Sequence, residues 1–188
     1  MKSHKSLGLS LVELIACLGV IAIMFSLATP SFTRIHSRSL ATAGINWIVG
    51  AVLFTRHAAI TYRVTTTLCP ASTKKNVCQG KWHDGLIIFA DHNADAILNG
   101  KDFLINRIHG DTINGTLTWR AFRNRQYLQM TQQGYTNYQN GNFTYCTENR
   151  QIEFARQIVI NMQGRSRLVH TRNDEGMPVD RRGRLLRC

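Results

Sequence analysis

The sequence predicts an α+β protein in which one long N-terminal helix packs on an antiparallel β-sheet domain. An apolar run at 9–29 leads into helically spaced apolar side chains that continue to about Tyr62. Short β-rich runs divided by Gly and Asn clusters make up the remainder. A chain of 188 residues with 44% hydrophobic content is long enough for one domain of this kind with an appended helix.

The apolar run at 9–29 has the length of a membrane span. Its 21 residues contain one charge, Glu13, and as a helix they span about 30 Å, which matches the bilayer core. Lys2 and Lys5 precede the run and hold the N-terminus in the cytoplasm by the positive-inside rule. We therefore expect a single-pass anchor with the rest of the chain outside.

A cleaved secretory signal is the alternative interpretation of this segment, with a small-x-small site at Ser26-Leu27-Ala28. Glu13 argues against it. A carboxylate costs about 2.5 to 3.5 kcal/mol at the centre of a membrane helix and less near its end, so such a residue usually has a partner and a purpose.

The residues around Gly8 resemble a known leader. The run Lys5-Ser6-Leu7-Gly8, followed by Leu9-Ser10-Leu11-Val12-Glu13-Leu14, is similar to the class III leader of type IV pilins and pseudopilins. The resemblance implies that a prepilin peptidase removes 1–8 by cutting after Gly8, and that Leu9 becomes the N-methylated first residue, although the family usually has Phe there. It also implies that Glu13 pairs with an N-terminal amine in the filament, which compensates its buried charge.

Pro30 ends the apolar run, and its ring and missing N–H would kink or break a continuing helix. Pilins resembling this chain have a proline at that place. We expect one long helix whose second, amphipathic half at 30–62 packs on the domain. Its apolar residues are Phe32, Ile35, Ile45, Trp47, Ile48, Val52, Leu53 and Ile60.

The domain at 63–188 contains seven predicted strands, at 64–68, 85–90, 103–108, 116–122, 127–130, 143–146 and 157–162. Two stretches within it resemble the GspH/FimT group of minor pilins and pseudopilins. Trp82 to Asn93 is similar to that group's W-x-x-G-x-x-x-F-x-D-x-N segment, and 158–167 is similar to its strand, turn and G-R-x-R motif. The resemblance implies the type IV pilin fold.

Cys17 lies in the apolar run, whereas the other four cysteines lie in the polar remainder. An even number outside the membrane indicates two disulfides in an oxidising compartment. Of the three possible pairings we favour Cys69 with Cys78 across a short loop, and Cys146 with Cys188. Buried free thiols are the alternative, and the spacing does not suit a structural zinc site.

Asp91, Asn93 and Asp95 have the spacing that begins a calcium loop, but Ala96 stands where that loop needs Gly and Asp102 where it needs Glu. We therefore expect this segment to cap a turn.

The histidines show no catalytic or metal-binding spacing; those considered are His83, His92, His109 and His170. No nucleophile elbow, P-loop, H-E-x-x-H or paired-carboxylate motif occurs in the sequence. We expect no enzyme activity, catalytic residue, metal or cofactor.

The chain is strongly basic, with 23 Lys and Arg against 11 Asp and Glu, or +12. Removal of 1–8 takes away two lysines and leaves +10. Such an excess favours polyanions, either nucleic acid or anionic lipid. The segment 164–188 has seven arginines and only three acidic residues. The arginines are Arg165, Arg167, Arg172, Arg181, Arg182, Arg184 and Arg187.

The planar fork of arginine binds phosphate oxygens bidentately. In an extended strand Arg165 and Arg167 would share a face, about 6.5 to 7 Å apart. A solvated run, or pairing with acidic patches on neighbouring pilins, is the alternative interpretation. The G-R-x-R motif resembles that of FimT-type minor pilins, which implies capture of DNA.

Three functional hypotheses follow. The first is a FimT-like minor pilin that binds DNA without sequence preference for uptake in natural transformation. The second is a GspH-like minor pseudopilin of a type II secretion system, and the third is an adhesive or structural minor pilin. The expected partners are other major and minor pilins, prepilin peptidase, DNA and the inner membrane. The expected location is the inner membrane with a periplasmic domain, and then the pilus at the cell surface.

Overall fold

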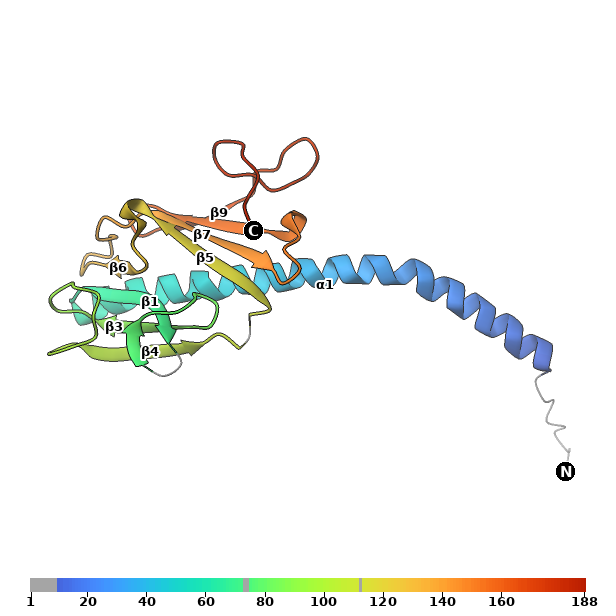
Figure 1. The fold of residues 1–188 in the computed structure, drawn as a ribbon, viewed down its shortest axis with the longest axis horizontal. Coiled ribbons are helices and arrows are strands. Elements are labelled where there is room, and N and C mark those ends of the chain that lie inside the picture. The colour runs from blue at the N-terminus through green and yellow to red at the C-terminus, as the bar shows by residue number, and fades with distance from the viewer. Residues whose placement is uncertain (1–9, 73–74, 112) are drawn as a thin grey trace, which may run out of the picture. The chain divides into compact units, whose positions relative to one another are not determined.

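The computed structural model describes residues 10–72, 75–111 and 113–188, so Gly8 and Leu9 lie outside the described residues. The chain forms two compact units, Met1–Ser37 and Arg38–Cys188. One helix, α1 (Leu11–Tyr62), runs from the first unit into the second (Figure 1).

Helix α1 is continuous over 52 residues and includes the position of Pro30. The predicted long helix is therefore confirmed, and Pro30 does not break it. Within the described residues, α1 is the one helix long and apolar enough to cross a membrane. Its first turn contains Glu13, whose backbone N–H donates to the Ser10 hydroxyl at 3.3 Å.

The second half of α1 packs on the domain with a stripe that differs from the predicted one. Ile45, Ile48 and Val52 are buried as predicted, and small residues complete the stripe. Gly44 allows the closest approach, because a Cβ there would lie 2.3 Å from the Tyr145 ring. Four residues of the predicted face are exposed, because the 3.6-residue period turns them away from the stripe that the small residues form: Phe32, Ile35, Leu53 and Ile60.

Within the described residues, nine antiparallel strands form two sheets, whose arrangement can be followed in the ribbon (Figure 1). The five-stranded sheet has the order β2-β1-β3-β4, with β6 beside β1: β1 (Thr66–Ser72), β2 (Lys75–Cys78), β3 (Gly85–Ala90), β4 (Phe103–His109) and β6 (Leu128–Met130). The four-stranded sheet has the order β5-β7-β8-β9: β5 (Gly115–Ala121), β7 (Gly141–Thr147), β8 (Arg156–Ile160) and β9 (Ser166–Val169).

All seven predicted strands are present, with ends that differ by a few residues. The short strands β2 and β9 were not predicted, because four residues with few apolar side chains give little alternation. Two 3-10 turns complete the elements: η1 (Phe122–Asn124) and η2 (Ile152–Phe154).

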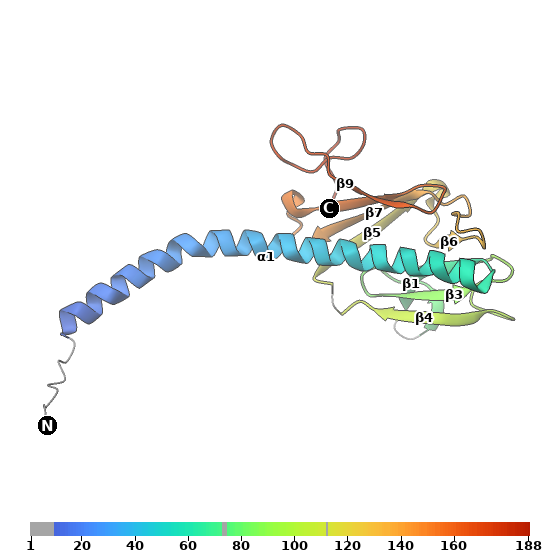
Figure 2. The ribbon, with the colours of Figure 1, turned by 180° about the vertical axis from the view of Figure 1, so that it is seen from behind.

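One hydrophobic core joins the second half of α1 to both sheets (Figure 2). Trp119, Phe143, Ile158 and Leu168 form one cross-strand row of the four-stranded sheet. The rings of Trp119 and Phe143 stack with centroids 4.3 Å apart. This row faces the core, so the alternate residues of the same strands face outward.

Candidate arginine-rich interface

The outward face of the four-stranded sheet is polar. Arg120, Asn142, Val159 and Arg167 are paired in register across its four strands. At about 4.8 Å between strands, this row spans about 14 Å and has an arginine at each end. The sheet therefore displays guanidinium groups on the side opposite the core.

The C-terminal tail, residues 170–188, is tied to this sheet. A disulfide joins Cys188 to Cys146 of β7, with Cα atoms 5.6 Å apart. Leu186 is buried with Cys146, and its N–H donates to the Pro178 carbonyl at 3.1 Å. The tail forms two loops that stand off the sheet in both views (Figures 1 and 2).

The disulfides have the pairing that the sequence favours. The second one joins Cys69 to Cys78 across a separation of nine residues, in the five-stranded sheet. Cys17 has a free thiol. The bond between Cys146 and Cys188 thus closes a loop that runs from β7 to the C-terminal residue and contains the whole tail.

Asp180 organises one of the tail loops. One of its carboxylate oxygens accepts from the backbone N–H groups of Arg182 at 2.8 Å and Arg184 at 3.0 Å. The other accepts from the Arg184 guanidinium at 2.8 and 3.0 Å. Desolvation opposes ionisation of Asp180, but these hydrogen bonds outweigh it and lower its pKa. The turn places Arg181 and Arg182 at its tip.

The same five-residue turn precedes β9. Asn161 accepts from the Arg165 backbone N–H at 2.9 Å, and the Gly164 N–H donates to the Asn161 carbonyl at 3.0 Å. Gly164 has φ +70°, and a Cβ there would lie 2.5 Å from the Gly134 carbonyl oxygen. The glycine of the G-R-x-R motif is therefore needed for both the turn and a close backbone approach.

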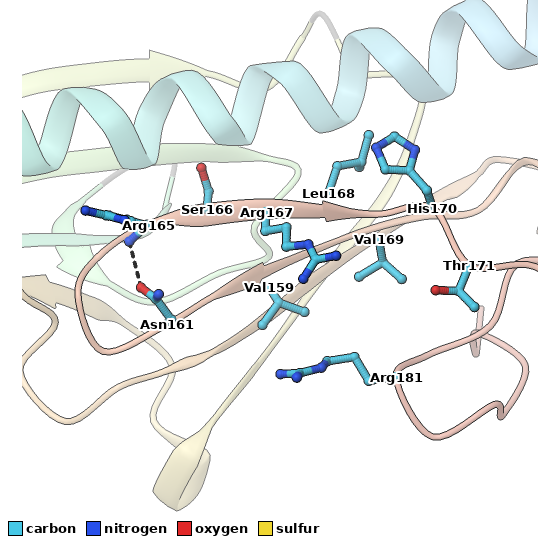
Figure 3. A pocket seen from close by; sticks show the side chains of 10 residues that line it. All are labelled: Val159, Asn161, Arg165, Ser166, Arg167, Leu168, Val169, His170, Thr171 and Arg181. Atoms are coloured by element: carbon cyan, nitrogen blue, oxygen red, sulfur yellow. Dashed lines mark hydrogen bonds between the residues drawn. The ribbon is translucent and has the colours of Figure 1, made fainter.

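Arg165, Arg167 and Arg181 line one hollow of about 620 Å³ (Figure 3). Arg167 and Arg181 point to the same side of β9 as Val159, whereas Leu168 points to the other side. Val159 and Arg181 also line a second hollow of about 450 Å³, together with Arg182. Because the two hollows share Val159 and Arg181, the arginines at β9, Arg165 and Arg167, adjoin Arg181 and Arg182 of the tail.

Six of the seven arginines of 164–188 are exposed and have no carboxylate within ion-pairing distance among the described residues: Arg165, Arg167, Arg172, Arg181, Arg182 and Arg187. Arg184 is the exception on this face, because it pairs with Asp180. Guanidinium groups that lack an internal counter-ion are available to an external polyanion.

Comparison with known proteins identifies the family. The family model described as Type II transport protein GspH matches residues 45–164, which is more than half of the chain. The chain belongs to the GspH family. The match begins in the second half of α1 and ends at Gly164, so all seven arginines of 164–188 follow the matched segment of this GspH-family protein.

The structure is similar to crystal structures of the type IV minor pilin FimU of Pseudomonas aeruginosa strain PAO1. In one crystal form the TM-score is 0.52 at 20% identity, over 72% of this chain and 89% of that chain. In another the TM-score is 0.48 at 20% identity, over 69% and 90%. The first likeness shows that the GspH-family protein has the fold of a type IV pilin. No protein of curated function matches the chain significantly.

Arg172 lies apart from the other tail arginines in the GspH-family protein. It lines a separate hollow of about 290 Å³ with Arg156 of β8. Burial lowers the pKa of Arg156, and the positive charges of Arg172 and Arg38 lower it further. Arg187 lines a further hollow of about 200 Å³, which shares Asp180 and Arg184 with the 450 Å³ hollow.

Sequence reasoning missed Arg120, which lines that last hollow together with Arg187. The alternation of Thr118, Trp119 and Arg120 in β5 could have indicated that Arg120 faces outward, because Trp119 faces the core. It could not have indicated that β5 and β9 lie in the same sheet.

The aspartate segment serves the fold as a turn. Buried Asp91 accepts from the Thr67 hydroxyl at 2.6 Å and the Gln129 amide at 2.9 Å. Asp95 accepts from the Ile97 N–H at 2.7 Å, which lowers its pKa. Asp91, Asp95 and Asp102 bring carboxylate oxygens within 4.8 Å of one another, with backbone N–H donors directed at each. These contacts support the interpretation as a capped turn.

The candidate group of three carboxylates among the described residues includes none of the four histidines named in the sequence analysis. His83 accepts from the Leu117 N–H at 3.3 Å, and His92 lies 3.5 Å from Asp102. His109 and His170 are exposed.

Proposed function

We propose that this GspH-family protein is a FimT-like minor type IV pilin that binds DNA without sequence preference, for DNA uptake in natural transformation. The observation that carries the proposal is the set of six exposed arginines in 164–188 that have no carboxylate partner among the described residues. Four of them line two adjoining hollows over the outward face of the four-stranded sheet: Arg165, Arg167, Arg181 and Arg182. We assign Arg184 and Arg187 to the outer part of the same surface and Arg172 to a separate contact beside it.

The geometry suits a phosphate backbone. Arginine forks bind phosphate oxygens, and such contacts position a nucleic acid without reading its bases. Each phosphate neutralised should contribute about 0.9 to the slope of log affinity against log salt for a duplex. Binding should therefore weaken steeply as salt is added.

The rest of the proposal concerns assembly. Prepilin peptidase removes 1–8, and 9–29 holds the protein in the inner membrane until it enters the filament. The half at 30–62 and the domain at 63–188 then lie in the periplasm and meet other pilins. Glu13 lies in the first turn of α1, where a neighbouring N-terminal amine would compensate its charge. The protein acts through binding and assembly, without catalysis.

DNA binding by the unit Arg38–Cys188, which contains the whole hydrophobic core, tests the proposal. Fluorescence anisotropy at two salt concentrations should show salt-sensitive binding. The double substitution Arg165→Ala with Arg167→Ala should weaken that binding at least tenfold and reduce the salt slope by about 1.8.

The matched control removes the same charge elsewhere. Lys81→Ala with Lys101→Ala takes two exposed cations from the loops of the five-stranded sheet and should leave the affinity within about twofold. Equal losses in both double variants would mean that binding depends on net charge alone. No binding by the parent protein would overturn the proposal.

A minor pseudopilin of a type II secretion system is the second candidate. The observation that favours it is the family description, Type II transport protein GspH, for the matched segment. In that case the exposed arginines would meet acidic surfaces of neighbouring subunits. Arg165→Ala with Arg167→Ala would then impair secretion or co-purification with other pilins, and DNA would not bind.

A further inference from the structure

Two loops with exposed aromatic side chains adjoin at one end of the four-stranded sheet. One follows β5 and contains Phe122, and the other precedes β7 and contains Tyr138. The Phe122 N–H donates to the Asn140 carbonyl at 2.9 Å, which holds the loops together. Phe122 is 57% exposed and Tyr138 is 70% exposed.

Both loops contain strained backbone. Arg123, Asn124 and Tyr138 have φ of +64°, +52° and +60°, so three of the seven described non-glycine residues with positive φ lie here. A left-handed conformation is costly for a bulky aromatic residue. Strain of this kind persists only where the surroundings impose it, and it concentrates at functional sites.

A buried amide network imposes the conformation of Tyr138. Its neighbour Gln139 accepts from the Gln129 backbone N–H at 2.6 Å and donates to the Gln129 side chain at 3.1 Å. Gln129 in turn donates to buried Asp91 at 2.9 Å. On the other side, the Asn137 N–H donates to the Gln129 carbonyl at 3.0 Å. Both neighbours of Tyr138 are thus fixed while its ring stands in solvent.

The charge around the two rings is positive. The Arg123 guanidinium lies 5.7 Å from the centroid of the Phe122 ring. Asn140 lines the same hollow as Arg181 and Arg182, so the loops adjoin the arginine face. No Asp or Glu occurs anywhere in 112–147. Asp180 also lines that hollow, but its carboxylate is paired with Arg184. Exposed aromatic rings beside an excess of arginines suit a ligand that combines flat rings with negative charge, which is single-stranded nucleic acid.

We propose that Phe122 and Tyr138 form a stacking site for unpaired nucleobases at the edge of the arginine face. This inference rests on the proposed DNA binding and names the form of DNA that the site prefers. Backbone phosphates would lie against Arg181 and Arg182 while the bases stack on the two rings. Single-stranded DNA, or the frayed end of a duplex, should therefore bind more tightly than an equally long blunt duplex.

The test uses the full chain in detergent micelles and three probes of equal length: an oligothymidylate, an abasic strand of the same backbone, and a blunt duplex. Tyr138→Asn removes the ring with a residue that tolerates positive φ. It should weaken oligothymidylate binding about tenfold and change binding to the abasic strand and the duplex by less than about twofold. Phe122→Ala should act in the same direction.

Two further variants separate stacking from a change in fold. Tyr138→Phe keeps the ring and should bind oligothymidylate as the parent does. Tyr62→Ala removes a similarly exposed ring from the end of α1, where it packs on Phe103 of β4, and should have no effect on any probe. If Tyr138→Phe loses as much affinity as Tyr138→Asn, the stacking inference is wrong.

The outcomes distinguish this inference from the proposed function. If the parent binds both DNA forms and Tyr138→Asn lowers neither, the stacking site is refuted and the DNA-binding proposal stands; the aromatic loops would then be candidates for contact with another pilin subunit. If the parent binds no probe, both proposals fail.

Discussion

The segments 63–111 and 112–188 contribute one sheet each, apart from β6, yet they differ sharply in charge. The first has six basic and five acidic residues, or +1, whereas the second has twelve basic and five acidic residues, or +7. In the first segment carboxylates such as Asp91 are used inside the fold to fix loops. In the second, eleven of the twelve arginines have no carboxylate within ion-pairing distance among the described residues. One antiparallel architecture thus serves as a scaffold on one side and as a charged surface on the other.

Removal of each disulfide in turn is the strongest test of this difference between the two sheets. In the chain-entropy relation, a loop of 42 residues contributes about 4 kcal/mol of stability and a loop of nine about 2.6 kcal/mol. Cys146→Ser with Cys188→Ser should lower the free energy of unfolding by about the first amount and also abolish tight DNA binding. Cys69→Ser with Cys78→Ser should lower stability less and leave the affinity unchanged. Denaturant titration and anisotropy measure both effects.

The glycine of the G-R-x-R motif is the next test, because Gly164 has both positive φ and a close backbone neighbour. Gly164→Ala should cost about 2 to 3 kcal/mol, since its Cβ would lie 2.5 Å from the Gly134 carbonyl oxygen. Gly183→Ala is the matched control, with φ +74° and nothing within 4 Å, and should cost about 1 kcal/mol. Equal losses in unfolding experiments would show that only φ matters at Gly164.

Removal of Arg120 tests whether the arginine surface extends across the whole sheet. Arg120→Ala should weaken DNA binding about three- to fivefold and reduce the salt slope by about 0.9, because one phosphate contact is lost. Arg150→Ala, which removes an exposed arginine from the turn after β7, should leave both quantities unchanged. An unchanged affinity for Arg120→Ala would confine the surface to β9 and the tail.

The smallest effect concerns the pH dependence of the tail loop. The pKa of Asp180 is lowered from 3.8 in the folded protein. The ionised carboxylate therefore stabilises the turn above about pH 3.8, and this contribution is lost as the pH falls through the lower, folded value. The amide resonances of Arg182 and Arg184 should be constant from pH 5 to 7 and shift only in stronger acid. Asp180→Asn should remove that titration, and a shift centred above pH 4 would contradict the assignment.

Local patterns were sufficient to predict much of this fold. The long helix and seven of the nine described strands follow from periodicity and turn residues. Both favoured disulfide pairings are present, although only Cys69 with Cys78 spans a short loop. The buried face of α1 was predicted only in part, because Gly44 and the alanines make contacts that apolar spacing does not reveal. Small residues allow close packing without contributing to a hydrophobic pattern.

The site was harder to predict than the fold because it depends on pairing between distant strands. The sequence pointed to the tail arginines, but Arg120 joins them only because β5, β7, β8 and β9 are paired in that order. Composition also does not show that Arg184 forms an ion pair with Asp180 whereas Arg181 has no carboxylate partner among the described residues. The exposure of Tyr138 depends on an amide network that links Gln129 and Gln139.

The bond between Cys146 and Cys188 also has a mechanical consequence. Strand β9 lies at the edge of its sheet, so a tail attached there alone would peel from β8 one hydrogen bond at a time under load. The disulfide anchors the other end of the tail on β7. If DNA binds at Arg181 and Arg182, a pull on it would be shared between β9 and β7. The tail would then resist detachment because it is attached to the sheet both at β9 and, through the disulfide, at β7.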